Sequence, residues 1–454
     1  MSTELKVTSI ERYHLCDDTS QNPNVISCEL TVSGDVNVDI ATSALREIAD
    51  RHPMTFARLK KRGRKHVWVL GSSSLNELCW QQINPADSVA EWRTIQPDKG
   101  IPTRCLMRRD GELTHLSFRT HHAAMDGLGG LQIVNDWLLT YHRISCGTNK
   151  PRSRETSPEI LPHRNDLRLL NRRFLARLWI QPIAMFGAIK FLMRTVRPVT
   201  GGVTGAGTSS GSVESTSTSA ATSPSDFQLL QATLSAEVVE KMKTRAASAK
   251  ATVNELILRS VFLSLHQFRK QHGLYRSGEW LRLLVPISIR DFADRRLPAA
   301  NRATIVQLDR RDRDFRDPSG MMWGLNYELG CVKRWNLEKT FLLVMRCASV
   351  IPGFIARSCK KDVCRATSVV TNLGAPFERS KLSRIDGKLA AGNLIVENIN
   401  LVVPLRKQTP IGFAVLRYND QQHICMHFDP IQIERQHAEE ILRMVRGNLE
   451  QDAD

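Results

Sequence analysis

The amino-acid sequence predicts a mixed α/β (α+β) protein made of two halves. Apolar residues recur at every second position in some segments and three or four positions apart in others, and both patterns occur in each half. A stretch rich in Gly, Ser, Thr and Ala, 198–226, separates the halves and has too little apolar surface to offset chain entropy. We therefore expect an N-terminal subdomain at 1–197, a flexible linker, and a C-terminal subdomain at 227–454.

The first half begins with an expected strand and an expected helix. Residues 25–33 are strand-like, and Asn37 is the N-cap of a helix whose apolar side chains share one face. Arg51 and His52 end this helix, because Pro53 cannot continue it.

A later strand in the first half leads into another helix. Along residues 113–122 alternate side chains share a face, and His122 points with the apolar set. A turn follows at Asp126, after which apolar residues recur at helical spacing over 128–141. Two histidines, His121 and His122, therefore lie at a strand-to-helix junction.

The second half begins with two expected helices. One follows Ser235, and the other follows Thr252, which has the capping-box spacing with Glu255. A final helix is expected over 432–449. Between these helices the strand-like apolar runs are 281–289, 303–308, 366–373, 394–403, 411–418 and 423–428.

Composition limits the classes of partner and site. The net charge of +17 attracts anionic partners, but the basic residues are scattered without a zinc-finger or aromatic-basic pattern, so nucleic acid is not expected. The ten cysteines contain no CxxC pair, which argues against a metal site or a disulfide framework. Residues 1–16 contain no apolar run of signal-peptide length, and we expect a cytoplasmic protein.

The segment 172–197 has bulky apolar residues between clusters of Arg and Lys. Pro182 and Lys190 interrupt it, and it is too short to span a bilayer. Two structures fit this pattern: an interfacial helix that lies on a membrane, and an amphipathic helix that packs on the protein body. The first would make the protein peripheral to the membrane.

The segment with the clearest chemical meaning runs from His121 to Gly127 and has the form HHxxxDG. A strand fixes the direction of an imidazole, and a glycine directly after it permits a sharp turn, so His122 is both oriented and open to a cleft. With an ordinary pKa of about 6.5, a neutral imidazole accepts a proton from a hydroxyl or an amine. The alternative is that the two histidines only form hydrogen bonds at a sheet edge.

This motif resembles the active site of the condensation-domain and chloramphenicol-acetyltransferase-like acyltransferases, in which the second histidine, here His122, is catalytic. Four further segments resemble that superfamily in the same order. They are Ala49–Pro53 (its RHxxL element), Thr252–Leu256 (the helix that opens its second half), Val285–Arg290 (its PxSxR strand) and Thr371–Gly374 (its late SNxG turn). The DFGWG and PLW signatures of two branches are absent, as are adenylation and carrier-protein motifs, so the resemblance implies a stand-alone member.

The resemblance implies two chloramphenicol-acetyltransferase-like subdomains in a V, with a tunnel between them. His122 would be the general base for direct transfer of an acyl group from a thioester to an alcohol or an amine. The thioester would belong to coenzyme A, or to phosphopantetheine on an acidic acyl carrier protein, and would be a co-substrate, with no bound cofactor. The alternative is a non-catalytic member that binds an acyl carrier or a membrane.

The resemblance also implies supporting residues around the turn. Asp126 is expected to be structural and paired with Arg290, with Arg51 as the second choice of partner. His121 and Gly127 would support the turn. A buried carboxylate without such a partner would cost several kcal/mol, whereas the alternative interpretation of Arg290 is a solvated charge at a strand end.

An oxyanion that develops on the thioester carbonyl needs a hydrogen-bond donor. The Gly127 amide is one candidate, and the turn at Thr371 and Asn372 is another. The alternative interpretation of Asn372 is a turn residue that tolerates unusual backbone angles beside Gly374.

Overall fold

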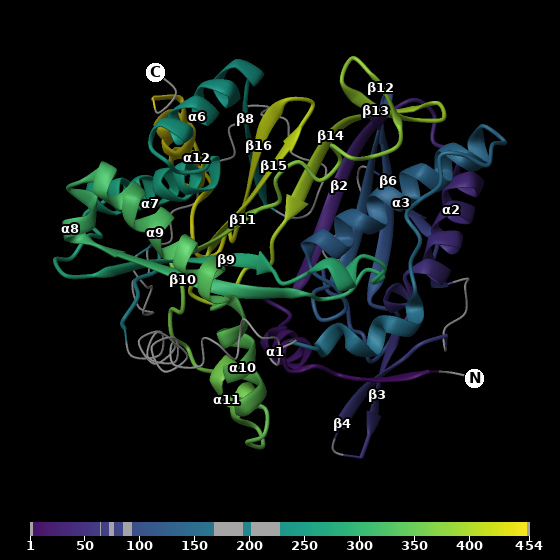
Figure 1. Ribbon diagram of the computed structural model, residues 1–454, viewed down its shortest axis with the longest axis horizontal. Coiled ribbons are helices and arrows are strands. Elements are labelled where there is room, and N and C mark those ends of the chain that lie inside the picture. Colours follow the sequence, from purple (N-terminus) through teal and green to yellow (C-terminus); the bar gives the residue numbers. More distant parts are fainter. Residues whose placement is uncertain are drawn as a thin grey trace, which may run out of the picture.

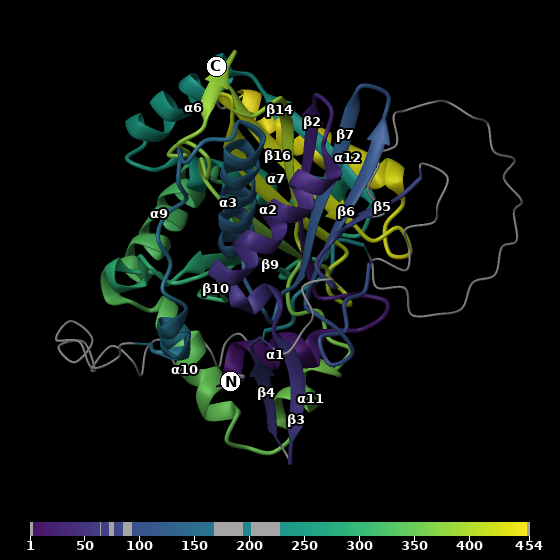
Figure 2. The ribbon, with the colours of Figure 1, turned by 90° about the vertical axis from the view of Figure 1, so that its right-hand side faces the viewer.

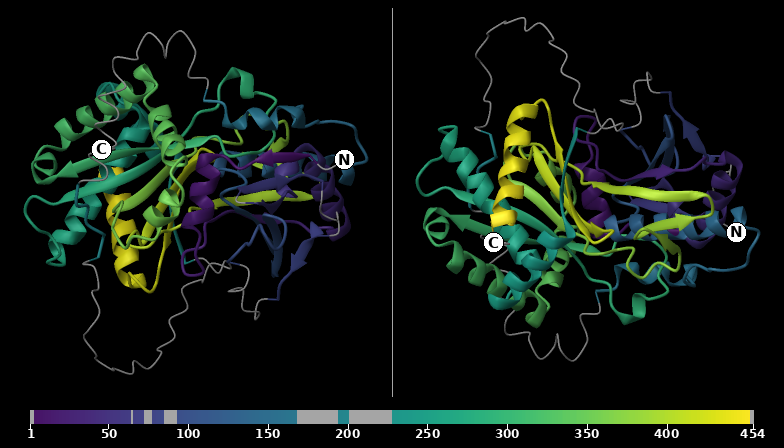
Figure 3. Two further views of the ribbon diagram at one scale, coloured as in Figure 1. Left: turned by 90° about the horizontal axis from the view of Figure 1, so that it is seen from below. Right: turned by 90° about the horizontal axis from the view of Figure 1, so that it is seen from above.

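The computed structural model describes residues 3–63, 65–71, 77–84, 93–167, 194–200 and 228–451. Within these ranges helices flank a seven-stranded, a six-stranded and a three-stranded sheet (Figure 1). The two larger sheets form the centres of two lobes that stand side by side in Figures 1 and 3. The predicted mixed α/β class with two subdomains is confirmed.

The seven-stranded sheet is the centre of the first lobe, here called the N lobe. Its strand order is β12-β13-β14-β2-β7-β6-β5. These strands are β12 (Ser383–Ile385), β13 (Lys388–Ala391), β14 (Leu394–Val402), β2 (Val25–Ser33), β7 (Leu113–His121), β6 (Thr103–Asp110) and β5 (Trp80–Gln82). Two helices, α2 (Val38–Arg51) and α3 (Gly127–Ser145), share one buried apolar core with this sheet (Figure 2).

The six-stranded sheet is the centre of the second lobe, here called the C lobe. Its strand order is β10-β9-β11-β15-β16-β8. These strands are β10 (Ala303–Arg311), β9 (Trp280–Ser288), β11 (Ser368–Asn372), β15 (Ile411–Tyr418), β16 (Gln421–Phe428) and β8 (Leu229–Leu234). The helices that share a second core with it are α6 (Ala236–Ser248), α7 (Val253–Gln271), α9 (Pro318–Trp335) and α12 (Arg435–Gln451).

Local sequence signals fix where the predicted helices begin. Asn37 and Ser235 accept hydrogen bonds from the first-turn amides of α2 and α6. Thr252 and Glu255 form the predicted capping box at the start of α7. These side chains satisfy backbone amides that have no partner inside a helix, and the predictions of helices after these residues are confirmed.

Each lobe also contains chain from the other half of the sequence. In β14, residues 395–402 pair antiparallel with residues 27–33 of β2. The yellow-green strands β12 to β14 therefore stand among the purple and blue elements of the N lobe (Figure 3). Conversely, the C lobe contains residues of the first half: Val196 forms a β-bridge with Trp280, and Val199 is buried in the C-lobe core.

Two predicted segments lie largely outside the described residues. Of the linker 198–226, only 198–200 are described. Of the segment 172–197, only 194–197 are described. The subdomain boundaries and the membrane contact therefore stay predictions. In the described part of the chain, no helix combines the length and the apolar character needed to cross a bilayer.

A smaller layer lies below the two lobes in Figure 1. It contains the three-stranded sheet and three helices. These are β1 (Glu4–Lys6), β4 (Lys65–Val69), β3 (Arg58–Arg62), α1 (Ser9–Asp17), α10 (Glu338–Ala348) and α11 (Phe354–Cys359). Helix α1 packs against both α10 and α11, so the start of the chain is in contact with helices of the second half.

Candidate active site

The HHxxxDG segment forms a tight turn between β7 and α3. Strand β7 ends at His121, one residue before the predicted end, and α3 begins directly after Asp126. Asp126 caps this helix, because its Oδ1 accepts a hydrogen bond from the Gly129 amide at 2.8 Å. Residues 123–125 are fully buried. The turn is thus anchored in the core and carries His122 between two rigid elements.

The ring of His122 is held in one tautomer. Its Nδ1 lies 3.1 Å from the carbonyl oxygen of Met125, and because a carbonyl only accepts, Nδ1 carries the proton. Nε2 then keeps its lone pair. Burial lowers the pKa of His122 below its ordinary value, although the Asp126 carboxylate opposes this shift. The side chain is partly exposed, and it is neutral near pH 7.

The neighbouring ring of His121 has a different hydrogen-bond arrangement. It is completely buried, and its Nδ1 accepts a hydrogen bond from the Ala123 amide at 3.1 Å. The proton is then on Nε2, which lies 3.6 Å from Oδ2 of Asp18. The Nδ1 lone pair of His121 is therefore engaged within the turn itself.

The Asp126 carboxylate is paired with Arg290. Nη1 of the arginine donates to Oδ2 at 2.7 Å and Nη2 donates to Oδ1 at 2.9 Å, a bidentate arrangement. The Arg302 amide also donates to Oδ2, at 2.8 Å. Burial alone would raise the pKa of Asp126, but these partners outweigh it and hold the pKa below its ordinary value. Arg51, the second choice, lies 3.4 Å from Asp136 instead.

The loop between β9 and β10, residues 289–302, joins the C lobe to this turn. Asn301 Nδ2 donates to the backbone carbonyl of His122 at 2.8 Å. The Ala299 amide donates to Nδ1 of His52 at 3.0 Å. The loop therefore connects the HHxxxDG turn with a second segment of the resemblance, the one that ends α2.

The turn after β11 lies beside the HHxxxDG turn. Asn372 Nδ2 donates to Oδ1 of Asn254 at 3.2 Å, and Asn372 Oδ1 accepts from the Gly374 amide at 2.9 Å. A Cβ atom at Gly127 would lie 3.7 Å from Cδ2 of Leu373. Two further segments of the resemblance, the start of α7 and this turn, thus meet beside the HHxxxDG turn.

The three oxyanion candidates occupy different positions. Gly127 is the first residue of α3. Thr371 is buried inside β11, where it pairs with Ala414 of β15. The side-chain amide of Asn372 is engaged in the turn itself.

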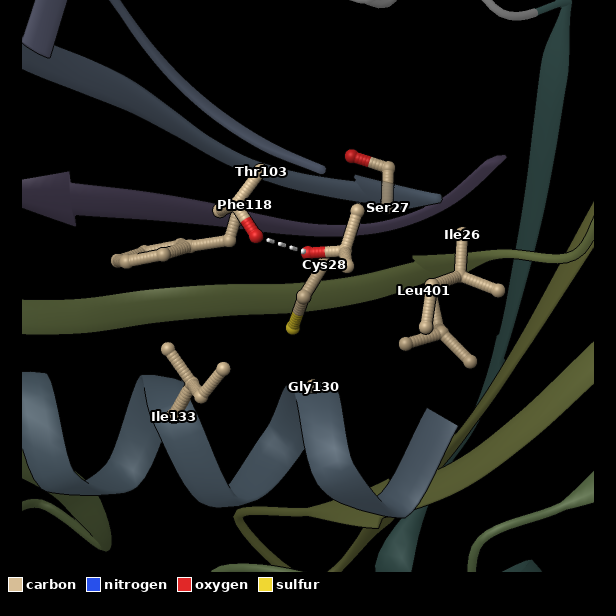
Figure 4. Close-up of a pocket in the computed structure, with 9 residues that line it drawn as sticks. Ile26, Ser27, Cys28, Thr103, Phe118, Gly130, Ile133 and Leu401 are labelled. Atoms are coloured by element: carbon tan, nitrogen blue, oxygen red, sulfur yellow. Dashed lines mark hydrogen bonds between the residues drawn. The ribbon is translucent and has the colours of Figure 1, made fainter. Parts of the chain in front are cut away.

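A small pocket lies between the N-lobe sheet and α3, next to the turn. Figure 4 shows Cys28 and Phe118 on the sheet side and Ile133 on the helix side. The complete lining is Ile26, Ser27, Cys28, Thr103, Phe118, Thr120, Gly130, Ile133 and Leu401. Its volume is about 10 Å³, which is room for about one water molecule. The pocket begins at the first turn of α3 and is largely apolar.

Two contacts of His122 were not predicted from the sequence. The ring of His14, in α1, stacks on the His122 ring, with centroids 4.0 Å apart and planes at 20°. The Asn24 carbonyl accepts from the His122 amide at 2.8 Å. The capping-box spacing of Thr8 and Glu11 is a signal that predicts α1, but no pattern in the sequence pairs this helix with the turn.

The described residues contain neither a metal-ligand cluster nor a disulfide. Within the residues that the structure describes, no group of three or more His, Cys, Asp or Glu side chains is arranged to hold a metal ion. All ten cysteines are free thiols.

Relatives by sequence match a limited part of this chain. No family model matches the chain. Two uncharacterized proteins from strains of Mycobacterium tuberculosis are 27% identical to it over 149 residues, which is 30% of this chain and 32% of theirs. The chain therefore matches about a third of the length of these curated relatives, and neither of them has a described activity.

Comparison by structure covers the whole chain. The first condensation domain of the calcium-dependent antibiotic synthetase has a TM-score of 0.69 at 13% identity, over 100% of this chain and 97% of that one. The starter condensation domain of rhizomide synthetase, in complex with C8-CoA and Leu-SNAC, has a TM-score of 0.67 at 12% identity, over 100% and 95%. Polyketide synthase associated protein 5 from Mycobacterium tuberculosis has a TM-score of 0.59 at 12% identity, over 99% and 97%. The chain therefore has the condensation-domain fold, built from two chloramphenicol-acetyltransferase-like subdomains.

Proposed function

We propose that this chain is an acyltransferase that moves an acyl group from a thioester to an alcohol or an amine, with His122 as the general base. The observation that carries the proposal is the hydrogen bond from Nδ1 of His122 to the Met125 carbonyl. It leaves a lone pair on Nε2 of a ring whose pKa lies below its ordinary value. Such a ring is neutral near pH 7 and ready to accept a proton.

In the proposed reaction, Nε2 of His122 accepts the proton of the acceptor while the acceptor oxygen or nitrogen attacks the thioester carbonyl carbon. The carbonyl oxygen becomes negatively charged in the tetrahedral intermediate. When the intermediate collapses, the C–S bond breaks, and the imidazolium returns the proton to the leaving thiolate. The acyl group thus passes directly to the acceptor. Asp126 takes no part in this proton transfer, because its carboxylate is bound to Arg290.

The start of α3 is the best position for the oxyanion. The amides of a helix N-terminus point outward at the positive end of the helix dipole, and Gly127 is the first residue of this helix. Asn372 is less suitable, because its side-chain amide already donates to Asn254. Thr371 is less suitable as well, because it is buried within the sheet. These contacts favour the Gly127 amide as the donor.

The donor is proposed to be an acyl-CoA, or an acylated phosphopantetheine arm on a separate carrier protein. The net charge of +17 attracts either anion, and one solved structure of this fold is a complex with C8-CoA. An epimerization domain of tyrocidine synthetase has the same fold at a TM-score of 0.62, so the proposal depends on the His122 geometry and not on the fold alone.

Thiol release from acyl-CoA esters tests the proposal. The full chain is incubated with acetyl-CoA, octanoyl-CoA or palmitoyl-CoA and a panel of alcohols and amines. We expect thiol release that depends on the acceptor, that is lost in His122→Gln, and that is retained in His66→Gln, a control at an exposed histidine of β4. Thermal unfolding establishes that both variants are folded. Equal rates for wild type and His122→Gln would refute the proposal, and binding of octanoyl-CoA without release would favour a non-catalytic carrier-binding protein.

A further inference from the structure

The ring that stacks on His122 belongs to a residue of α1, in the smaller layer below the two lobes. His14 lies on α1, and its ring covers one face of the His122 ring at 4.0 Å between centroids, with 20° between the planes. The side chain of His14 is buried. Nearly parallel rings at this distance leave no space for water between them. One face of His122 is therefore closed by an imidazole.

The backbone connects the same two residues. Asn24 accepts from the His122 amide at 2.8 Å through its carbonyl, and its side-chain Nδ2 donates to the His14 carbonyl at 3.3 Å. The Asn24 amide in turn donates to Oδ1 of Asp18, just after α1, at 2.8 Å. The position of α1 is thus coupled to the position of the turn.

Ion pairs hold α1 in place at both ends. Glu11, which is completely buried, receives Nε and Nη2 of Arg164 at 2.7 Å and 3.0 Å. Near the other end, Arg406 Nη2 donates to Oδ1 of Asp17 at 2.7 Å. Because charged hydrogen bonds restrict both partners, and the bidentate Arg164–Glu11 pair most of all, the ring of His14 has a fixed position from which to restrict its neighbour.

We propose that His14 is a positioning residue for His122: its ring holds the His122 imidazole in the plane in which Nδ1 reaches the Met125 carbonyl, and it keeps water from that face. This inference rests on the proposed role of His122 as the base. A ring that rotates out of this plane loses the hydrogen bond to Met125, and Nε2 is then no longer the fixed acceptor. His14 itself does not touch the reacting atoms in this scheme.

The charges around the two rings agree with this role. Burial, together with the neighbouring His122, His121 and Arg406, holds the pKa of His14 well below its ordinary value. His14 therefore stays uncharged when the pH falls through the range in which ordinary histidines are protonated. No positive charge then arises against the face of His122, and the Asp126 carboxylate alone acts to raise the pKa of that ring through its charge.

Phenylalanine at position 14 is the matched variant that keeps a flat ring. Among the residues that the structure describes, Nδ1 of His14 has no hydrogen-bond partner, so His14→Phe loses no bond at that atom. His14→Ala removes the ring and admits water. His266→Ala is the control, because the ring of His266 is stacked on Phe315 in the C lobe with centroids 4.1 Å apart and planes at 1°.

The first test is an NMR titration of histidine-labelled full-length protein, which needs no substrate. The His122 signal is assigned by its absence in His122→Gln. In wild type we expect it to titrate below the ordinary histidine range. In His14→Ala its pKa should rise toward the ordinary value, because the ring gains water, whereas His14→Phe and His266→Ala should leave it unchanged. An unchanged His122 titration in a folded His14→Ala protein would overturn the inference.

The second test is steady-state acyl transfer from octanoyl-CoA. We expect His14→Ala to lower kcat by about 10-fold or more with little change in KM, because a misplaced base slows the chemical step. His14→Phe should restore most of kcat, and His266→Ala should match wild type. If His14→Ala does not fold, His14→Leu replaces it, because leucine fills the space without a flat ring. A kcat of His14→Leu equal to that of His14→Phe would overturn the proposal. An active His122→Gln protein would instead refute the general-base assignment, and the NMR titration would still decide whether His14 controls the ring.

Discussion

His121 and His122 are adjacent in the chain, yet their surroundings give the two rings opposite hydrogen-bond arrangements. In His121 the Nδ1 atom accepts, from the Ala123 amide, so its lone pair is already used. In His122 the Nδ1 atom donates, to the Met125 carbonyl, so the Nε2 lone pair stays free. His121 is also completely buried, whereas His122 is partly exposed.

This difference shows what makes one histidine of the pair suitable as a base. Both rings are close to a carboxylate and both lie at the end of β7. The tautomer separates them, and a single backbone contact in each case sets it. The chain turns sharply after His121, so that the ring of His121 lies in the core and the ring of His122 lies against His14 of α1.

The largest expected effect on activity comes from exchanging each histidine for glutamine. His122→Gln should lower the acyl-transfer rate by about 10²- to 10⁴-fold, the usual contribution of a general base. His121→Gln should lower the acyl-transfer rate much less, because the ring of His121 does not receive the proton. Thiol release from octanoyl-CoA measures both. A folded His121→Gln protein with the larger loss would reverse the assignment of the two rings.

A large effect on stability is expected at Asp126, which fixes the turn that separates the two rings. Asp126→Ala should lower the free energy of unfolding by about 3–5 kcal/mol, because Arg290 and the Arg302 amide lose a buried partner. Urea unfolding followed by circular dichroism measures this change. The control is Asp35→Ala, whose ion pair with Arg109 is exposed and should contribute about 1 kcal/mol or less. Equal losses in the two variants would contradict a structural role for Asp126.

A smaller effect on stability is expected at His121. His121→Leu removes the acceptor of the buried Ala123 amide and should lower the free energy of unfolding by about 1–3 kcal/mol. His142→Leu is the control, since His142 Nδ1 also accepts a backbone amide, that of Gly392, at 3.0 Å, but near the far end of α3. We expect both variants to be destabilised and His142→Leu to keep its full transfer rate. No loss of stability in His121→Leu would weaken the structural assignment of this ring.

The smallest expected effect is a shift in pH dependence. Neutral His122 is the active form, and burial lowers its pKa below the ordinary value of about 6.5. Activity should therefore stay level as the pH falls through 6.5 and decline only at lower pH, when the ring is protonated. The profile of kcat/KM reports this pKa in the free enzyme. A midpoint at or above about 6.5 would contradict the described environment of the ring.

Features encoded locally were predictable from the sequence. The capping residues Asn37, Ser235 and Thr252 marked the starts of helices because each forms its bonds within one turn of the chain. The turn at 121–127 was recognisable for the same reason. The resemblance predicts Arg290 as the partner of Asp126, and the structure contains that pair.

Features that depend on distant contacts were not predictable. Nothing near His14 in the sequence indicates that its ring reaches His122, and nothing near Asn301 indicates its bond to the His122 carbonyl. The pairing of β14 with β2 was missed because an apolar strand pattern does not specify which sheet the strand joins. Periodicity defines a strand or a helix face, whereas its partner is chosen by the packing of the whole chain.

The place of β14 has a consequence for how the protein is made. Strand β2 is synthesised more than three hundred residues before its neighbour on one side, at 394–402. Until then β2 has an open edge, which can pair with another chain. Contacts so distant in sequence also form slowly. Nascent or truncated chains that end before residue 394 should therefore aggregate more readily than the complete protein, and should depend more on chaperones.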